Sequence, residues 1–169
     1  MDAAVPSRVD MVSRTMPTAA SVRAILEQVT DPEIPVLTIA DIGILRDVAV
    51  DADGRVTVTI TPTYSGCPAM EVIASDVRTA LADAGYDATV ATVFNPPWTT
   101  AWMSDEAKRK LAGFGIAPPG SAIDIVAEVL CPNCASSATR VIAEFSSTAC
   151  KRMLVCTSCG EPFDQFKEI

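Results

Sequence analysis

The sequence predicts an α+β fold, in which a domain with the element order α-β-β-α-β-α is followed by a small β-rich module. Three observations support this: helical and strand-like periodicities alternate over residues 17–112, residues 113–120 have the Gly and Pro content of a linker, and five of the six cysteines follow that linker. A chain of 169 residues has room for one domain of about 100 residues and a small satellite. We therefore expect a flexible leader (1–16), an α+β domain (17–112), a linker (113–120) and a C-terminal module (121–169).

The α+β domain is expected to begin with a short helix and a β-hairpin. Apolar residues recur at helical spacing after Ser21, which we interpret as the N-cap, and Pro32 ends the helix; these residues are Val22, Ile25, Leu26 and Val29. Asp53-Gly54 is a strong two-residue turn signal between two stretches that alternate apolar and polar residues. The return strand has valines and isoleucine on one face and threonines on the other, which predicts a sheet covered by helices on one side.

A second helix is expected to begin at Cys67-Pro68, because Pro62 cannot continue a strand and proline suits the first turn of a helix. Gly85 is placed to end this helix, and a strand over residues 88–94 should follow. Ser104 then caps a short helix whose first turn is acidic.

The composition argues against several classes of protein. The chain has no histidine, which removes Ser-His-Asp and Cys-His nucleophile systems and histidine-based metal sites. Its formal net charge of −8 is unsuited to a phosphate backbone, so we expect no nucleic-acid partner. No apolar run approaches the roughly 18 residues of a membrane span, and the first residues lack the apolar segment of a signal peptide. We expect a cytoplasmic protein that does not contact membranes.

Two cysteine pairs in the C-terminal module have the spacing C-x2-C-x21-C-x2-C, which is typical of a zinc ribbon; they are Cys131, Cys134, Cys156 and Cys159. Tight turns direct both thiolates of a pair at one tetrahedral ion, and four ligands leave no open catalytic position. Fewer than about 50 residues rarely fold without such support. We expect a structural zinc ion. Iron, in a rubredoxin-like site or a cluster, is the first alternative, and disulfides are the second.

Cys67 stands apart from the other cysteines, at the expected start of a helix. Unpaired N–H groups and the positive end of the helix dipole would lower the pKa of a thiol there, which favours a soft metal ligand or a thiol donor. Asp31 and Glu33, in the segment DPEIP, are candidates to supply carboxylates beside it. The alternatives are that Cys67 is a small buried apolar residue and that DPEIP is a solvated loop.

Three further residues are candidates for a role. Cys150 lies outside both cysteine pairs, and it is either an extra thiol near the zinc knuckles or a buried apolar residue. Trp98 and Trp102 follow two prolines and are four residues apart, so they form either a docking surface for a partner or part of the core.

The motifs DPEIP, DIGIL and TPTYSGCP, in this order, resemble the iron-sulfur assembly (metal-sulfur cluster biosynthesis) domain family over about Ala19 to Pro118. The segments FNPPWTTAWMS, CPNC, FSSTACKRML and CTSCGEPFDQFK resemble the longer PaaD (PaaJ) subgroup of that family, found with phenylacetate degradation. By this resemblance Cys67 is the family cysteine, Asp31 and Glu33 form the acidic segment, and Asp41 is the turn aspartate.

The resemblance implies an accessory protein that helps to assemble an iron–sulfur or di-iron centre in the phenylacetyl-CoA monooxygenase (epoxidase), a system of aromatic compound catabolism, without catalysing a reaction itself. The implied partners are the oxygenase and reductase components. One cysteine is too few to hold a cluster, so a homodimer, a carboxylate or a client thiol would have to complete the transient iron or iron–sulfur site. The alternatives are a structural, non-catalytic subunit of the complex and an electron carrier with iron in the ribbon.

Overall fold

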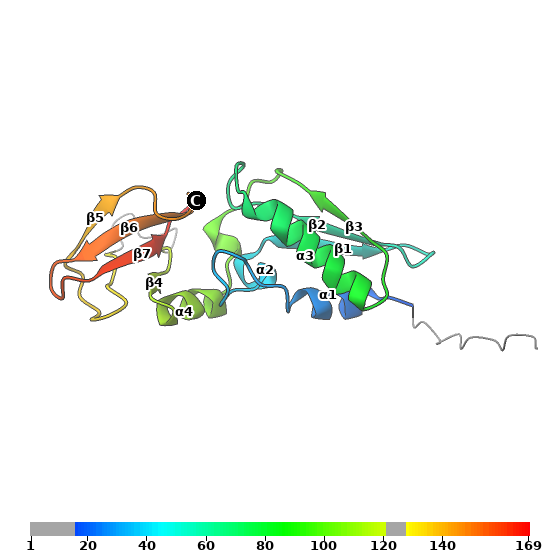
Figure 1. Ribbon diagram of the computed structural model, residues 1–169, viewed down its shortest axis with the longest axis horizontal. Coiled ribbons are helices and arrows are strands. Elements are labelled where there is room, and N and C mark those ends of the chain that lie inside the picture. The colour runs from blue at the N-terminus through cyan, green and yellow to red at the C-terminus, as the bar shows by residue number, and fades with distance from the viewer. Residues whose placement is uncertain (1–15, 121–127) are drawn as a thin grey trace, which may run out of the picture.

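The computed structural model describes residues 16–120 and 128–169, and these residues form two modules that follow one another along the long axis of the molecule (Figure 1). The first module contains a three-stranded sheet, and the second contains a four-stranded sheet. Helix α4 (Asp105–Gly113) lies between them at one side (Figure 1). The α+β class and the β-rich C-terminal module are confirmed, whereas the expected leader lies outside the described residues except for Met16.

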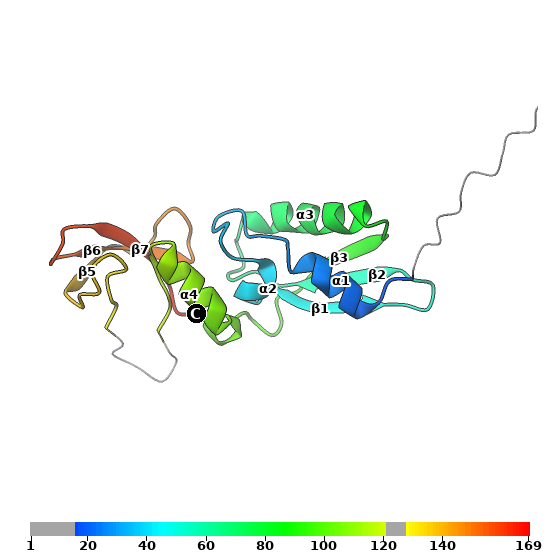
Figure 2. The ribbon, with the colours of Figure 1, turned by 90° about the horizontal axis from the view of Figure 1, so that it is seen from below.

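The sheet of the first module has the order β1-β2-β3. Strands β1 (Leu45–Val50) and β2 (Val56–Ile60) pair antiparallel through the predicted hairpin, and β3 (Ala88–Thr92) pairs parallel with β2 after a crossover through α3 (Ala69–Asp83). Helices α1 (Ala19–Leu26) and α3 cover the same face of this sheet (Figures 1 and 2). Side chains of β2 that face the helices are buried, and its threonines lie on the other face, as the alternation predicts.

Two short helices begin with capping boxes. Thr18 is the N-cap of α1, whereas the sequence suggested Ser21. Ser21 is instead the third helical residue: its backbone N–H donates to the Thr18 hydroxyl, and its own hydroxyl accepts from the Thr18 N–H. Helix α2 (Ile39–Ile42) was not predicted; Thr38 caps it, and Asp41 accepts a hydrogen bond from the Thr38 N–H. Gly43 ends α2 with φ +81°, and a Cβ there would lie 2.7 Å from the carbonyl oxygen of Trp102. The DIGIL motif therefore has a structural role.

The segment expected as a linker contains a strand. Residues Ile116–Ala117 form β4, which pairs in parallel with β7 (Pro162–Phe166) at one edge of the second sheet, whose order is β4-β7-β6-β5. Strands β5 (Thr139–Ala143) and β6 (Lys151–Cys156) complete it. The domain boundary at residues 113–120 stays a prediction. Part of this segment, β4, follows α4 directly and belongs to the sheet of the second module.

The C-terminal residues return to the first module. The backbone N–H of Thr100, in the short 3-10 helix η1 (Thr100–Trp102), donates to the carbonyl of Ile169 over 3.1 Å. The rings of Trp98 and Phe166 lie 5.9 Å apart between centroids, and Phe166 belongs to the core of the first module. Figure 1 accordingly shows the C-terminus between the modules. Within the described ranges, no helix has the length and apolar character needed to span a membrane.

Candidate metal sites

The four paired cysteines converge at the end of the second sheet that is distant from the first module. Their sulfur atoms all lie within 4.8 Å of one another; the residues are Cys131, Cys134, Cys156 and Cys159. Each pair is a tight turn followed by a residue with positive φ, Ala135 at 59° and Gly160 at 82°. The sulfur atoms are 3.8 Å apart between Cys131 and Cys159 and 3.6 Å apart between Cys134 and Cys156.

This spacing fits a metal ion held by four thiolates. Zinc–sulfur bonds of about 2.3 Å in a tetrahedron place the sulfur atoms about 3.8 Å apart. Hydrogen bonds from the backbone N–H groups of Cys159 and Ser158 lower the pKa of Cys156 to about 6. The N–H of Ser136 lowers the pKa of Cys134, but hydrogen bonding with the other thiols, Cys156 first, raises it to about 12. Cys134 therefore needs a bound cation to become a thiolate at neutral pH.

Cys67 lies in the loop that leads from β2 into α3, immediately before Pro68, which is the N-cap of that helix. The backbone N–H of Met70 donates to the Cys67 carbonyl over 3.4 Å, and the N–H groups of Ala69 and Met70 act to lower the pKa of the thiol. The thiol is half-buried and packs against the core of the first module. The predicted placement at a helix start is thus what the structure shows.

The prediction of a lowered pKa for Cys67 is wrong. Burial raises the pKa of this thiol, and the neighbouring Cys150 and Asp31 raise it further, so together they outweigh the two backbone hydrogen bonds. The sequence showed only the local helix terminus, whereas the opposing effects come from residues distant in the chain. Without a bound cation, Cys67 therefore stays a neutral thiol at pH 7.

The carboxylate of Asp31 lies on the wall of the cavity that Cys67 lines. It is 7% exposed, and its Oδ1 accepts hydrogen bonds of 2.8 Å from the N–H groups of both Glu33 and Ile34, which fixes the loop. No described residue donates a hydrogen bond to the other oxygen, Oδ2. Glu33 lines the same cavity but is exposed, so only Asp31 presents a buried carboxylate.

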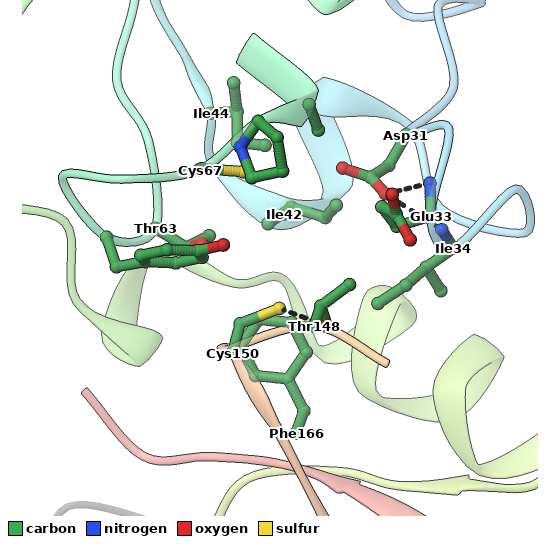
Figure 3. A pocket seen from close by; sticks show the side chains of 13 residues that line it. Asp31, Glu33, Ile34, Ile42, Ile44, Thr63, Cys67, Thr148, Cys150 and Phe166 are labelled. Carbon is green, nitrogen blue, oxygen red and sulfur yellow. Dashed lines mark hydrogen bonds between the residues drawn. The ribbon is translucent and has the colours of Figure 1, made fainter. Parts of the chain in front are cut away.

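Cys150 enters this cavity from the second module. It precedes β6 and lies at the opposite end of that strand from Cys156, about 20 Å away at about 3.3 Å per residue, so it is not near the zinc knuckles. Its thiol is buried, 3.1 Å from the hydroxyl of Thr148, and it contacts the core of the first module. Figure 3 shows Cys67 and Cys150 on opposite walls of the cavity, with Asp31 at a third side.

The cavity between the modules has a volume of about 30 Å³ and is lined mainly by apolar side chains. Its polar groups are the two thiols, the Asp31 and Glu33 carboxylates, and the hydroxyls of two threonines and Tyr64. Burial raises the pKa of Tyr64, and negative charge on Cys67 or Cys150 would raise it further. The arrangement suits a soft cation more than an organic substrate.

The two tryptophans differ in their surroundings. Trp98 is 3% exposed, donates from Nε1 to the carbonyl of Ile42 over 3.1 Å and packs on Phe166, so it forms part of the core and is not a docking surface. Trp102 is half-buried, with the guanidinium of Arg46 3.4 Å from its ring centroid. Its role in docking stays a prediction.

Asp41, the turn aspartate of the resemblance, does not line the Cys67 cavity. Its carboxylate is 2.6 Å from the ammonium of Lys110. Burial acts to raise the pKa of Asp41, but the hydrogen bonds from Lys110 and Thr38 prevail and lower it. Asp41 therefore connects α2 to α4 and lies outside the Cys67 cavity.

Known proteins resemble this chain in both modules. Residues 19–93 match the family described as iron-sulfur cluster assembly protein, and residues 118–167 match the PaaD zinc beta ribbon domain. A protein of Escherichia coli (strain K12), provisionally named as the D subunit of 1,2-phenylacetyl-CoA epoxidase, is 45% identical over 155 residues, which are 89% of this chain and 93% of the relative.

The first module alone has further relatives. The Fe-S protein maturation auxiliary factor YitW of Bacillus subtilis (strain 168) is 46% identical over 88 residues, covering 51% of this chain and 85% of that protein. The crystal structure of the domain of unknown function DUF59 from Bacillus anthracis superposes with a TM-score of 0.52 at 35% identity, over 55% of this chain and 90% of that structure. Both the assembly-type domain and the ribbon therefore have known counterparts.

Proposed function

This chain belongs to the family of the 1,2-phenylacetyl-CoA epoxidase D subunit, and on that premise we propose that it helps to assemble an iron–sulfur or di-iron centre of the phenylacetyl-CoA monooxygenase (epoxidase). Cys67 is the residue that receives the iron or the cluster. The observation that supports this most is the position of its thiol, at the start of α3 and on the wall of a cavity with a buried carboxylate. Relatives of the first module named as Fe-S protein maturation factors support the same role.

The surroundings of Cys67 explain how cargo can be accepted and released. Burial and the nearby Cys150 and Asp31 keep the thiol protonated, so binding of a cation displaces the proton to solvent and forms a metal–sulfur bond. The N–H groups of Ala69 and Met70 then stabilise the bound sulfur. When a client takes the metal, Cys67 regains a proton, and this favours release over retention.

The ribbon, in this proposal, holds a structural zinc ion through its four cysteines. The sulfur–sulfur distances of 3.6 and 3.8 Å fit zinc and also an iron–thiolate site. Iron would allow the ribbon to carry electrons, and its strong colour would distinguish it from colourless zinc. A colourless protein with one zinc ion per chain is the result expected.

The test of the assembly role is to produce the oxygenase and reductase components together with wild-type protein or with Cys67→Ser. We expect Cys67→Ser to lower the iron and acid-labile sulfide of the purified components to the level found without this protein. Ser65→Ala, an exposed change in the same loop, is the matched control and should behave as wild type. Full metal content with Cys67→Ser would contradict the proposal.

A second candidate function is that of a structural component that stays in the oxygenase complex. The apolar side chains of Val141, Ile142 and Phe145 are exposed on and beside β5, at the edge of the second sheet, and favour a stable partner there. This function predicts that the protein purifies in a fixed ratio with a fully active oxygenase. It also predicts that Cys67→Ser changes neither the ratio nor the activity.

A further inference from the structure

We propose that the free edge of strand β3 is the surface through which two copies of this chain pair, so that their three-stranded sheets form one continuous sheet in an antiparallel dimer. The surface does not include Cys67, so the inference goes beyond the proposed function and does not depend on it. Its consequence for that function is that the two Cys67 thiols of a dimer lie far apart.

Strand β3 is the least protected of the strands at the edges of the two sheets. These edge strands are β1 and β3 in the first sheet and β4 and β5 in the second. Strands β1 and β5 each contain a charged residue and a break in register, and β4 has two residues and leads into two prolines; all of these features discourage pairing with another chain. In contrast, residues 88–94 contain no charge and no proline, and the register of β3 with β2 is unbroken.

The backbone of β3 offers hydrogen-bonding groups to a partner. The Asp87 carbonyl accepts from the N–H of Val56 over 3.1 Å, and the N–H of Val93 donates to the Ile60 carbonyl over 2.9 Å, so odd-numbered residues face β2. Successive residues of a strand direct their N–H and C=O groups to opposite sides, so the residues between them direct theirs away from β2. These outward residues are Ala88, Val90 and Thr92. Among the described residues, β2 is the one strand that pairs with β3.

Two copies can pair antiparallel about a two-fold axis at Val90. In that register Val90 lies opposite Val90 of the second copy, and Ala88 lies opposite its Thr92, so every outward N–H and C=O of these residues gains a partner. Val90 is half-buried in one chain, and the second copy covers its exposed part. Further along each chain, the same register brings Phe94, which is 57% exposed, beside Tyr86 of the second copy. The pairing therefore accounts for an exposed aromatic side chain.

The charges on α3 favour a second copy of the chain as the partner. Figure 1 shows β3 on the side of α3 that is away from α1. In a right-handed crossover from β2 to β3, the flank of α3 on that side carries Glu71 and Arg78, which are exposed, two helical turns apart and without an ion pair among the described residues. The exposed Asp76 and Asp83 lie on the opposite flank, so they do not repel a second copy at this surface.

The two α3 helices of the dimer run antiparallel, which makes their charges complementary. Strands about 4.8 Å apart place helices that lie over β2 and β3 about 10 Å from each other, an ordinary distance for packed helices. Glu71 of each copy then faces Arg78 of the other. One surface therefore supplies both members of the ion pair, as a two-fold interface requires.

The dimer keeps the two Cys67 cavities apart. Cys67 precedes α3, and antiparallel helices have their starts at opposite ends. The midpoint between Glu71 and Arg78 is about 7.5 residues from Cys67, so at about 1.5 Å per residue the two Cys67 residues lie about 20 Å apart along the helices. One cluster cannot bridge two thiols over that distance. Each chain of the dimer would therefore receive its cargo at its own cavity.

The test is the mass of the full zinc-loaded chain, measured by light scattering over a range of concentrations, together with amide hydrogen exchange. We expect wild type to form a dimer in which the outward amides of β3, such as that of Val90, exchange slowly and become fast on dilution. The amides of Thr89 and Ala91, which face β2, should stay slow throughout. Thr92→Pro removes an outward N–H at an exposed position and should weaken the dimer at least about 10-fold.

A charge exchange on α3 tests the geometry of the dimer. Glu71→Arg should weaken the dimer about 5-fold because two cations then face each other, and adding Arg78→Glu should restore it. Asp76→Arg, the same charge change on the opposite flank, is the matched control and should leave the dimer unchanged. Cys67→Ser should dimerise as wild type, so failure of the assembly role would leave this inference intact. A mass of one chain at every concentration would overturn the proposal, as would a dimer that both Thr92→Pro and Glu71→Arg leave unchanged.

Discussion

The two groups of cysteines in this molecule are built in different ways. In the ribbon, each pair lies in one tight turn, and the four sulfur atoms lie within 4.8 Å of one another. At the cavity, two thiols and a carboxylate come from three separate segments and from both modules. A local, closed set of ligands retains its metal, whereas groups brought together by tertiary packing keep their positions only while the two modules stay in contact.

We expect the cavity to depend on the ribbon module, and the ribbon not to depend on the cavity. The cavity needs the ribbon module, because Cys150 and Phe166 belong to that module and pack into the core of the first. The ribbon cysteines do not need Cys67, which lies far from them. The first experiments below test this one-way dependence, and the later ones test the smaller contributions of elements around the cavity.

Loss of a ribbon cysteine should abolish both sites. We expect Cys156→Ser, at a fully buried position, to remove the ribbon metal, since structural zinc contributes about 10 to 16 kcal/mol of apparent binding free energy in small modules. The unfolded ribbon would no longer place Cys150 at the cavity. Metal analysis measures the loss of ribbon zinc, and an anaerobic titration of the zinc-loaded chain with Co²⁺ measures the loss of binding at the cavity.

The reverse experiment is the control for this dependence. Cys67→Ser should retain one zinc ion per chain and an unchanged ribbon, as judged by amide resonances of β6 and β7. Loss of ribbon zinc in Cys67→Ser would show that the two sites are mutually dependent, which would contradict the one-way dependence.

Removal of Trp98 should separate the two sites. Trp98→Ala removes the packing on Phe166 and the hydrogen bond to Ile42, which costs about 3 to 5 kcal/mol of unfolding free energy for a buried tryptophan. We expect weaker cobalt binding at the cavity and unchanged zinc in the ribbon, measured by urea unfolding and titration. Trp102→Ala, at a half-buried ring, should cost less, and an equal loss from both variants would contradict this ranking.

The DIGIL turn supports the wall of the cavity through Ile42 and Ile44. Gly43→Ala should destabilise the protein by about 2 to 4 kcal/mol, because it combines an unfavourable positive φ with a Cβ 2.7 Å from a carbonyl oxygen. Gly115→Ala is the matched control: its φ is +87°, but its Cβ would meet no atom within 4 Å, so we expect only about 1 to 2 kcal/mol. The melting temperature should fall further in Gly43→Ala than in Gly115→Ala. Equal falls would contradict the close approach of residue 43 to the carbonyl oxygen of Trp102.

The Asp41–Lys110 pair should stabilise the fold without affecting either metal site. We expect Asp41→Asn to lower the unfolding free energy by about 1 kcal/mol at pH 7. Because the pKa of Asp41 is lowered in the folded state, the advantage of wild type is complete above the ordinary value of 3.8 and is lost as pH falls through the folded-state pKa. The unfolding free energies of wild type and Asp41→Asn, measured at pH 7 and at pH 3, check this expectation. Glu106→Gln, in an exposed pair with Arg109, should change stability by less than about 0.5 kcal/mol at either pH.

Local features of the fold were predictable from sequence. Pro62 and Pro68 set the end of one element and the start of the next, so Cys67 was correctly placed before α3. The Asp53-Gly54 turn predicted the β1–β2 hairpin, and the two C-x2-C turns predicted the cluster of four sulfur atoms. Each of these features depends on backbone preferences within a few residues.

Features set by distant contacts were not predictable. Helix α2 has only four residues and β4 only two, too few for a periodic pattern. The sequence contains no signal that brings Cys150 to Cys67; the only related clue is the resemblance of FSSTACKRML to a known subgroup. For the same reason the pKa of Cys67 was predicted in the wrong direction, since burial of the thiol and the nearby Cys150 and Asp31 outweigh the helix terminus.

The transfer of iron to a client is the most direct test of the proposed role of Cys67. The wild-type protein and Cys67→Ser, both with zinc in the ribbon, are loaded anaerobically with ⁵⁷Fe²⁺, passed over a desalting column and mixed with the iron-free oxygenase or reductase component. We expect labelled iron, followed by Mössbauer spectroscopy, to reach the client from wild type and not from Cys67→Ser, while the ribbon zinc stays in place. Equal transfer from both proteins, or none from wild type, would contradict it.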